Sequence, residues 1–515
     1  MSVPEIHPSS PVAPGRRQPP EEPTRLHRKV FGIVLGLVLA VVVYFLMPNE
    51  VPAALQGGER EFTAHGLAVT AAVAVLMGTW WITEAIPLAA TALVPLVAFP
   101  VTQVAEFRDV ASPFASGTIF LFMGGFFLAL ALQRWNLHRR IALRTVLLVG
   151  THPKQLVLGF MVATGFLSMW VSNTATAVMM LPIGLSVMAL VNPDARGLDL
   201  LKSNFGKALT LGIAYSASIA SLSTLIGTPP NTLMRAYLAD NHDIVIGFGQ
   251  WMLFAAPTAW LFLAIAWWLL VNVFFRPEID ELPGGRALIR QELDEMGPMH
   301  RGEKLVGGVF MVGALSWIFL PSLFRDAGIS DELIAMCIAL ALFLIPVHPR
   351  SGIPLLDWKT AKEIPWDILL LFGGGLSLSA MFTANGLSAW IGEVSRGVGG
   401  LPVVLIVLAV TALIIFLTEM TSNTATAAAF LPIMGGVAAG IDQDIMLLVI
   451  PVALAATCAF MLPVATPPNA IAFGSGYVRI GDMVKGGIWL NLIGMVLITV
   501  TVMVMGPLVL GISYG

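Results

Sequence analysis

The stretch Ser-Asn-Thr-Ala-Thr-Ala occurs twice in the chain, at residues 172–177 and again at residues 422–427. A second motif is also duplicated, because Thr-Pro-Pro-Asn stands at residues 228–231 and at residues 466–469. The copies lie 250 positions apart for the first motif and 238 for the second. Solenoid proteins repeat about every 20–50 residues, so this longer spacing indicates a duplicated helical bundle.

The composition around these motifs is that of a membrane protein. Of the 515 residues, 57% are hydrophobic and only 11% are charged, and the mean hydropathy is +0.84. Soluble domains carry about 25% charged residues, because their surface must be hydrated. These values exclude a disordered protein, a disulfide scaffold, a fibrous protein and a cytosolic enzyme. The net charge of −3 gives no reason to expect nucleic acid as a partner.

Metal and redox chemistry have no support in the sequence. The two cysteines, Cys337 and Cys458, lie in apolar runs without the spacing of a metal site, and we expect both in the core. The eight histidines are isolated from one another. The sequence therefore predicts no organic cofactor.

A helix needs about 20 apolar residues to cross a bilayer. Residues 1–29 are rich in proline and charge, and we expect them to form a disordered tail. The apolar runs that follow are 30–47, 65–82, 86–100, 116–133, 155–191, 207–234, 250–275, 304–321, 331–347, 366–383, 402–440, 445–476 and 484–511.

Four of these runs are interrupted by the duplicated motifs. Runs 155–191 and 402–440 are too long for one crossing, so each is predicted to be a re-entrant hairpin with its polar cluster at the tip. Runs 207–234 and 445–476 are predicted to be single crossings made of two half-helices. The expected fold is an all-α polytopic membrane protein with about eleven transmembrane helices plus two re-entrant helical hairpins in an inverted repeat.

The distribution of positive charge supports this count. With a cytoplasmic N-terminus, all but five of the 28 Lys and Arg residues fall on the cytoplasmic side. One wrong crossing would invert every later loop and remove this asymmetry. We therefore expect the N-terminus in the cytoplasm and the C-terminus outside. The five residues expected outside are Arg60, Arg108, Arg235, Arg325 and Arg396.

The same topology gives the two halves opposite orientations. The first repeat covers residues 30–275, a cytoplasmic connector covers 276–303, and the second repeat covers 304–515. The hairpin at 155–191 opens to the cytoplasm and the hairpin at 402–440 opens to the outside. Inverted repeats with broken helices are the construction of secondary transporters.

The hairpin tips combine the features of an anion site and a cation site. Near Ser172 and Ser422 a helix ends and exposes carbonyl oxygens, which suit a hard cation. Near Thr174 and Thr424 a helix begins and exposes N–H groups, which suit an anion. The alternative is that these polar side chains only cap helix ends, and some capping is expected in either case.

The motif segments contain no cationic side chain. Residues 156–193, 208–234, 402–441 and 446–478 hold no Lys, Arg or His. A bare dianion at this depth would be costly, and sodium ions bound beside it would supply the missing charge. This is a physical reason for coupling the anion to sodium.

These paired motifs, together with Thr-Glu-Ala-Ile-Pro at residues 83–87, resemble the divalent anion–sodium symporter family over residues 30–512. The resemblance implies transport of dicarboxylates, citrate or sulfate by a homodimer with an elevator mechanism. It implies a first sodium site at Ser168, Ser172, Asn173 and Gly227, and a second at Thr418, Thr421, Asn423 and Ala465. It implies substrate contacts from Asn173, Thr174, Thr228, Asn423, Thr424, Thr466 and Pro467.

Two acidic residues need separate interpretation. Glu419 is the ionisable residue of the second hairpin, and it either carries a proton or, as we favour, accepts hydrogen bonds from helix-end N–H groups. Its repeat counterpart is Met169, which argues against a duplicated coupling role. Glu84 lies at a helix junction before Pro87 and is expected to be a cap.

The sequence as a whole predicts a sodium-coupled symporter of a C4-dicarboxylate such as succinate, malate or fumarate in the bacterial inner membrane. Its expected partners are the substrate, sodium, membrane lipid and a second copy of the chain. Alternatives within the family are a sodium-independent dicarboxylate exchanger and a citrate or sulfate transporter. A channel or an intramembrane enzyme is a remote alternative, because the segments lack a general base, a metal set and an activated nucleophile.

Overall fold

The computed structural model describes residues 23–52, 55–56, 61–150, 152–191, 203–279, 284–324, 327–349 and 352–514. The expected tail therefore lies outside the described residues up to residue 22, as do the expected external charges Arg60 and Arg325. The first helix begins at Pro23, before the expected span at residue 30.

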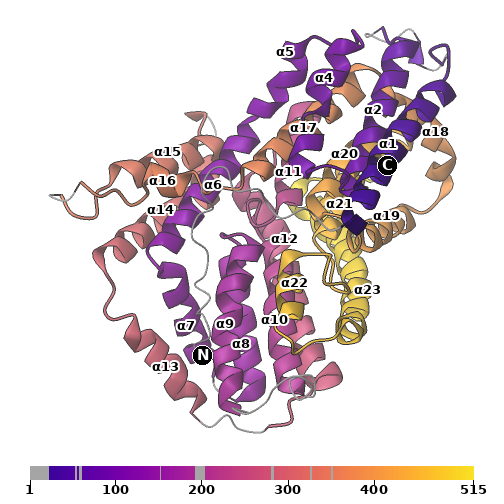
Figure 1. Ribbon diagram of the computed structural model, residues 1–515. Helices are drawn as coiled ribbons and strands as arrows, with labels where there is room; N and C mark the ends of the chain where they lie inside the picture. Colours follow the sequence, from indigo (N-terminus) through magenta and orange to yellow (C-terminus); the bar gives the residue numbers. More distant parts are fainter. Residues whose placement is uncertain are drawn as a thin grey trace.

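The described elements are helices, as predicted, and they run in two series (Figure 1). The first series is α1 (Pro23–Leu46), α2 (Ala64–Thr83), α3 (Leu88–Thr91), α4 (Val94–Val101), α5 (Phe107–Ala111), η2 (Ser112–Ala115), α6 (Gly117–Arg134), α7 (Leu137–Val149), α8 (Pro153–Ser168), α9 (Asn173–Val191), α10 (Asn204–Ser221), α11 (Pro229–His242), α12 (Phe248–Leu269) and η4 (Leu270–Phe274).

The short α13 (Gly285–Glu295) lies in the predicted connector and packs against α7. The second series is α14 (Arg301–Leu323), α15 (Asp331–Leu344), α16 (Trp358–Ala361), α17 (Trp366–Ala384), α18 (Leu387–Ser395), η6 (Arg396–Gly400), α19 (Val403–Thr418), α20 (Asn423–Gly440), α21 (Met446–Ala456), α22 (Pro467–Gly474), α23 (Ile480–Met505) and η7 (Gly506–Leu510).

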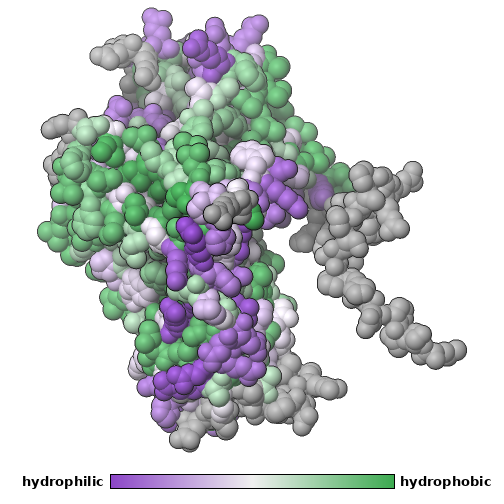
Figure 2. Space-filling model, turned by 90° about the vertical axis from the view of Figure 1, so that its left-hand side faces the viewer, coloured by the Kyte–Doolittle hydropathy of each residue, from purple (hydrophilic) through white to green (hydrophobic). Residues whose placement is uncertain are grey.

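Several helices have the length and composition of membrane spans. Among the described residues, seven helical stretches are long and apolar enough to cross a bilayer. Large apolar side chains on their surfaces are exposed, with Phe45 at 75% and Val312 at 66%. In Figure 2 hydrophobic residues form extended surface areas on the face that is drawn. Such exposure suits a lipid environment, because apolar area in water would be unfavourable. The seven stretches are Lys29–Leu46, Ala64–Thr83, Phe107–Arg134, Phe248–Phe274, Arg301–Pro321, Trp366–Ala384 and Ile480–Leu510.

One expected span is not a single helix. Residues 86–100 divide into α3 and α4, with a turn at residues 92–93. Pro95 lies in the first turn of α4 and has no N–H to donate back to Thr91, which favours the interruption of the helix at this point.

The duplicated motifs lie where helices are interrupted. The helices α8 and α9 form one antiparallel pair and α19 and α20 form the other, and Figure 1 shows the two pairs toward opposite ends of the molecule. The helices α10 and α11 are separated by residues 222–228, and α21 and α22 by residues 457–466. We call these two segments the first break and the second break.

The packing around the breaks repeats in the two halves. Helix α9 packs against α22 of the other half, and α20 packs against α11 of the other half. Each hairpin therefore meets the half-helix that follows the opposite break.

A buried ion-pair cluster fastens α11 to its surroundings. The Arg235 guanidinium is 2% exposed, donates to the carbonyl of Ile246 at 3.0 Å and pairs with Asp331 and Glu332 at the start of α15. Asp331 also accepts the Phe248 backbone N–H at 2.9 Å. The cluster thus connects α11 to α12 and α15.

The structure confirms the expectation for Glu84 and contradicts the expectation for Cys337. Glu84 is the C-cap of α2 with φ of 48°, so the expected cap is confirmed. Cys458 is buried, but Cys337 is exposed on α15, so the expectation that both cysteines lie in the core was wrong for Cys337. An apolar run cannot distinguish a core-facing position from a lipid-facing one, because both favour the same side chains.

Candidate binding site

The first hairpin tip is tied to α10 through Asn173. Its Oδ1 lies 2.5 Å from the hydroxyl oxygen of Ser168, which lies 2.8 Å from the carbonyl oxygen of Ala217. Its Nδ2 donates to the hydroxyl of Ser221 at 3.3 Å. A hydroxyl, an amide oxygen and a backbone carbonyl are thus brought together at the end of α8.

The second tip repeats this arrangement with different residues. The Oδ1 of Asn423 lies 2.7 Å from the hydroxyl oxygen of Thr418, which lies 2.9 Å from the carbonyl oxygen of Ala456. Ser168 and Thr418 are therefore equivalent in contacts as well as in sequence position. Neutral oxygen atoms of this kind are the ligands that hard cations prefer.

The motif serines act as caps, as the sequence allowed. The hydroxyl of Ser172 accepts the Ala175 N–H at 3.3 Å, and the hydroxyl of Ser422 accepts the Ala425 N–H at 3.4 Å. Thr174, which follows the first cap, is exposed. Each tip therefore presents the N-terminus of a long helix, α9 or α20, beside its oxygen cluster.

Gly227 lies close to the first tip. A Cβ on this residue would stand 2.2 Å from the carbonyl oxygen of Ser221, so no larger side chain fits without a shift of the backbone. The hydroxyl of Ser221 also accepts the Asn173 amide, so Asn173 and Gly227 both neighbour Ser221.

The two breaks contact each other across the repeat. The hydroxyl oxygens of Thr228 and Thr457 lie 3.1 Å apart, and both side chains are buried. Thr466 instead caps its own helix, because its hydroxyl accepts the Asn469 N–H at 3.2 Å. Ala465 is buried just before it, whereas Pro467 is exposed at the start of α22.

Thr421 differs from the other predicted sodium residues. Its hydroxyl bonds with the carbonyl of Leu417 at 2.9 Å and with the hydroxyl of Thr426 at 2.7 Å. The side chain is therefore engaged within its own hairpin and not with Asn423. Its backbone carbonyl is therefore the simpler route by which Thr421 could contribute to a cation site.

Glu419 braces the second break. Its Oε1 accepts the backbone N–H groups of Phe460 and Met461 at 2.7 and 2.9 Å, and its Oε2 accepts those of Met461 and Leu462 at 3.1 Å each. Asn491 donates to Oε1 at 2.7 Å. In each of these described contacts Glu419 accepts a hydrogen bond. This is the pattern of an ionised carboxylate with a structural role.

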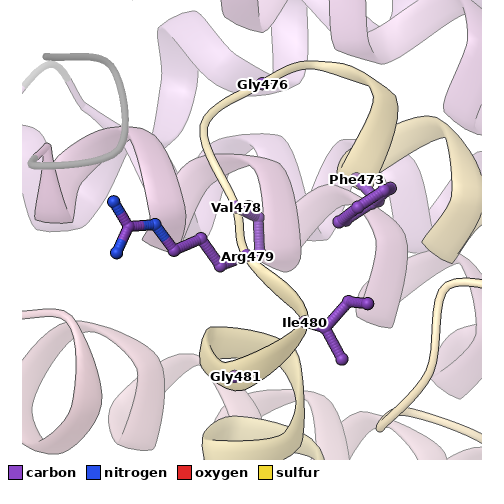
Figure 3. A pocket seen from close by; sticks show the side chains of 6 residues that line it. All are labelled: Phe473, Gly476, Val478, Arg479, Ile480 and Gly481. Atoms are coloured by element: carbon purple, nitrogen blue, oxygen red, sulfur yellow. The ribbon is translucent and has the colours of Figure 1, made fainter. Parts of the chain in front are cut away.

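A surface hollow elsewhere in the molecule does not coincide with the tips. Figure 3 shows it around the loop between α22 and α23, where Phe473 and Ile480 point to one side and Arg479 to the other. Gly476, Val478 and Gly481 complete its lining. None of the predicted site residues lines it.

The structure also identifies participants without an assigned role in the sequence. Ser221 accepts a hydrogen bond from Asn173 at the first tip, and Thr457 contacts Thr228 of the first break. Asn231 and Asn469, the last residues of the two Thr-Pro-Pro-Asn motifs, donate to carbonyls of their own breaks. The duplication of Thr-Pro-Pro-Asn was the available signal for the last two.

Comparison with known proteins identifies the family. A family model described as the sodium:sulfate symporter transmembrane region matches residues 28–512. A protein of Staphylococcus saprophyticus named sodium-dependent dicarboxylate transporter SdcS is 41% identical over 492 residues, covering 94% of this chain and 93% of the relative. Its namesake in Staphylococcus aureus is 42% identical over 497 residues, covering 94% and 92%.

Two solved structures are similar in fold. The YdaH transporter of Alcanivorax borkumensis superposes with a TM-score of 0.56 at 15% identity, covering 94% of this chain and 98% of that one. MtrF of Neisseria gonorrhoeae gives 0.53 at 14% identity, covering 95% and 96%. At such low identity the similarity concerns the fold alone. The match of nearly the whole chain to the family model is decisive: the chain is an integral membrane protein of the sodium:sulfate symporter family, as its duplicated motifs predicted.

Proposed function

We propose that this protein is a sodium-coupled symporter of a C4-dicarboxylate such as succinate, malate or fumarate. The observation that carries the proposal is the oxygen cluster at Asn173, which recurs at Asn423 in the other half. The names of the staphylococcal relatives favour a dicarboxylate and sodium. Like its relatives, the protein is a transporter and not an enzyme.

The proposed cation sites use the two tips. The first consists of Ser168, Ser172, Asn173 and Gly227, and the second of Thr418, Thr421, Asn423 and Ala465. The close approach of Gly227 to Ser221 supports the first set. In the second set Thr421 would contribute through its backbone.

The substrate carboxylates are proposed to bind at the N-termini of α9 and α20 beside these cations. The residues are Asn173, Thr174, Thr228, Asn423, Thr424, Thr466 and Pro467. Thr228 is the least available of them, because its hydroxyl contacts Thr457. The positive ends of the helix dipoles and the adjacent cations together would offset the charge of the dianion.

The two hairpins re-enter the membrane from opposite sides, and the part that carries them moves as an elevator against a scaffold that forms a homodimer. The protein resides in the bacterial plasma membrane with the N-terminus in the cytoplasm and the C-terminus outside. The packing of α9 on α22 and of α20 on α11 supports hairpins that move together with the half-helices.

The proposal is tested by transport in proteoliposomes with a panel of competitors. Uptake of labelled succinate is expected to be inhibited by unlabelled malate and fumarate. Stronger inhibition by citrate or sulfate would mean that one of these anions, and not a C4-dicarboxylate, is the substrate. Uptake that ignores sodium and requires internal dicarboxylate would identify an exchanger and contradict the cation sites.

A further inference from the structure

Each break is held by the asparagine that ends its own Thr-Pro-Pro-Asn motif. The Nδ2 of Asn231 donates to the carbonyls of Leu222 at 3.2 Å and Thr224 at 2.9 Å. The Nδ2 of Asn469 donates to the carbonyls of Ala459 and Leu462, each at 3.0 Å. In both halves the last residue of the Thr-Pro-Pro-Asn motif thus binds two carbonyls of the preceding break.

The burial of the two asparagines is also the same. Each is 0% exposed, and the Oδ1 of each has no hydrogen-bond partner among the described residues. A buried amide oxygen without a partner is unfavourable by about 1–3 kcal/mol. Its occurrence in both copies indicates that asparagine is retained for its two donor bonds.

The other supports of the breaks are not shared. The first break is held by Thr224, whose hydroxyl donates to the carbonyl of Met169, and by Trp251, whose indole donates to the carbonyl of Leu222. The second is held by Glu419 at the position equivalent to Met169. Among the side-chain hydrogen bonds described for the two breaks, those of the asparagine are present in both halves.

We propose that Asn231 and Asn469 are positioning residues for the two cation sites. Each holds its break so that the backbone at Gly227 or Ala465 is set against the hairpin tip. This inference rests on the proposed sodium coupling. The asparagines act indirectly, because they fix the shape of the break, whereas the tip residues would contact the cation.

The test measures how uptake of labelled succinate depends on sodium concentration in proteoliposomes. Asn231→Ala and Asn469→Ala are expected to raise the half-saturating sodium concentration about tenfold, which corresponds to about 1.4 kcal/mol. At saturating sodium the KM for succinate is expected to change less than the sodium dependence. An unchanged sodium dependence in both variants would overturn the inference.

A matched control is Asn385→Ala, which removes an amide that donates to Thr70 away from the breaks. It is expected to leave the sodium dependence as in the native protein, and a shift equal to that of Asn231→Ala would overturn the inference. Asn231→Asp separates positioning from direct ligation. It puts a carboxylate against two carbonyls and is expected to weaken sodium activation, whereas tighter activation would mean a ligand and contradict the proposal.

A second measurement, of thermal unfolding, applies to variants whose uptake is too low to give a sodium dependence. Sodium is expected to raise the unfolding temperature of the purified native protein, and this increase should shrink in both alanine variants. If the native protein itself shows neither sodium-dependent uptake nor stabilisation, the proposed function fails. If it shows both and the variants match it, the positioning role alone fails.

Discussion

Replacing Glu419 by Gln tests whether this residue is a brace or a proton carrier. The Gln side chain keeps one oxygen for Phe460 and Asn491, but it places an NH2 group where Oε2 now accepts the Leu462 N–H at 3.1 Å. One buried donor loses its acceptor and the remaining bonds lose the strength that the charge adds. These effects together are expected to lower the unfolding free energy by about 2–5 kcal/mol.

The assay is unfolding of the purified protein in mixed micelles, with Glu393→Gln as the control. Glu393 pairs with Arg396 at 2.9 Å on the surface, and its replacement is expected to change stability by at most about 1 kcal/mol. A Glu419→Gln protein as stable as the control would refute the structural assignment. A loss of pH-dependent transport without a loss of stability would favour the proton carrier.

Three further predictions concern other parts of the chain. Asn173→Ala and Asn423→Ala are each expected to abolish uptake while expression remains normal, and full activity of either would contradict the tip assignment. Arg235→Gln leaves Asp331 buried without its partner and is expected to cost about 3–5 kcal/mol in the unfolding assay, against little for Arg396→Gln. The backbone N–H of Thr360, and Arg134, hold the pKa of Asp357 below its ordinary value of 3.8. Ionised Asp357 therefore stabilises the fold above that value, and the deficit of Asp357→Asn in thermal unfolding should shrink as the pH falls below it.

Local signals were sufficient to locate the interruptions of the helices. A polar cluster inside an apolar run predicted the tips, and α8 ends at Ser168 while α9 begins at Asn173. The Pro-Pro pairs predicted the half-helices that begin at Pro229 and Pro467. The environment of Glu419 was also predictable in kind, because a carboxylate beside broken helices has N–H groups within reach.

Contacts made by the tertiary packing were not predictable. The pairing of Thr228 with Thr457 joins residues of different halves that the motifs do not align with each other, because the counterpart of Thr228 is Thr466. Pro95 could have predicted the split of residues 86–100, but the hydropathy of the run does not show where a helix is interrupted. The donor bonds of Asn231 depend on how the first break folds back, which no spacing in the sequence specifies.

The proposed coupling requires that the two tips bind sodium beside the dianion. The most direct measurement is uptake of labelled succinate into proteoliposomes at fixed membrane potential, with sodium outside, inside or absent. Accumulation above equilibrium is expected only with an inward sodium gradient, and none is expected in the Asn173→Ala or Asn423→Ala protein. Accumulation of the same extent without sodium would contradict it.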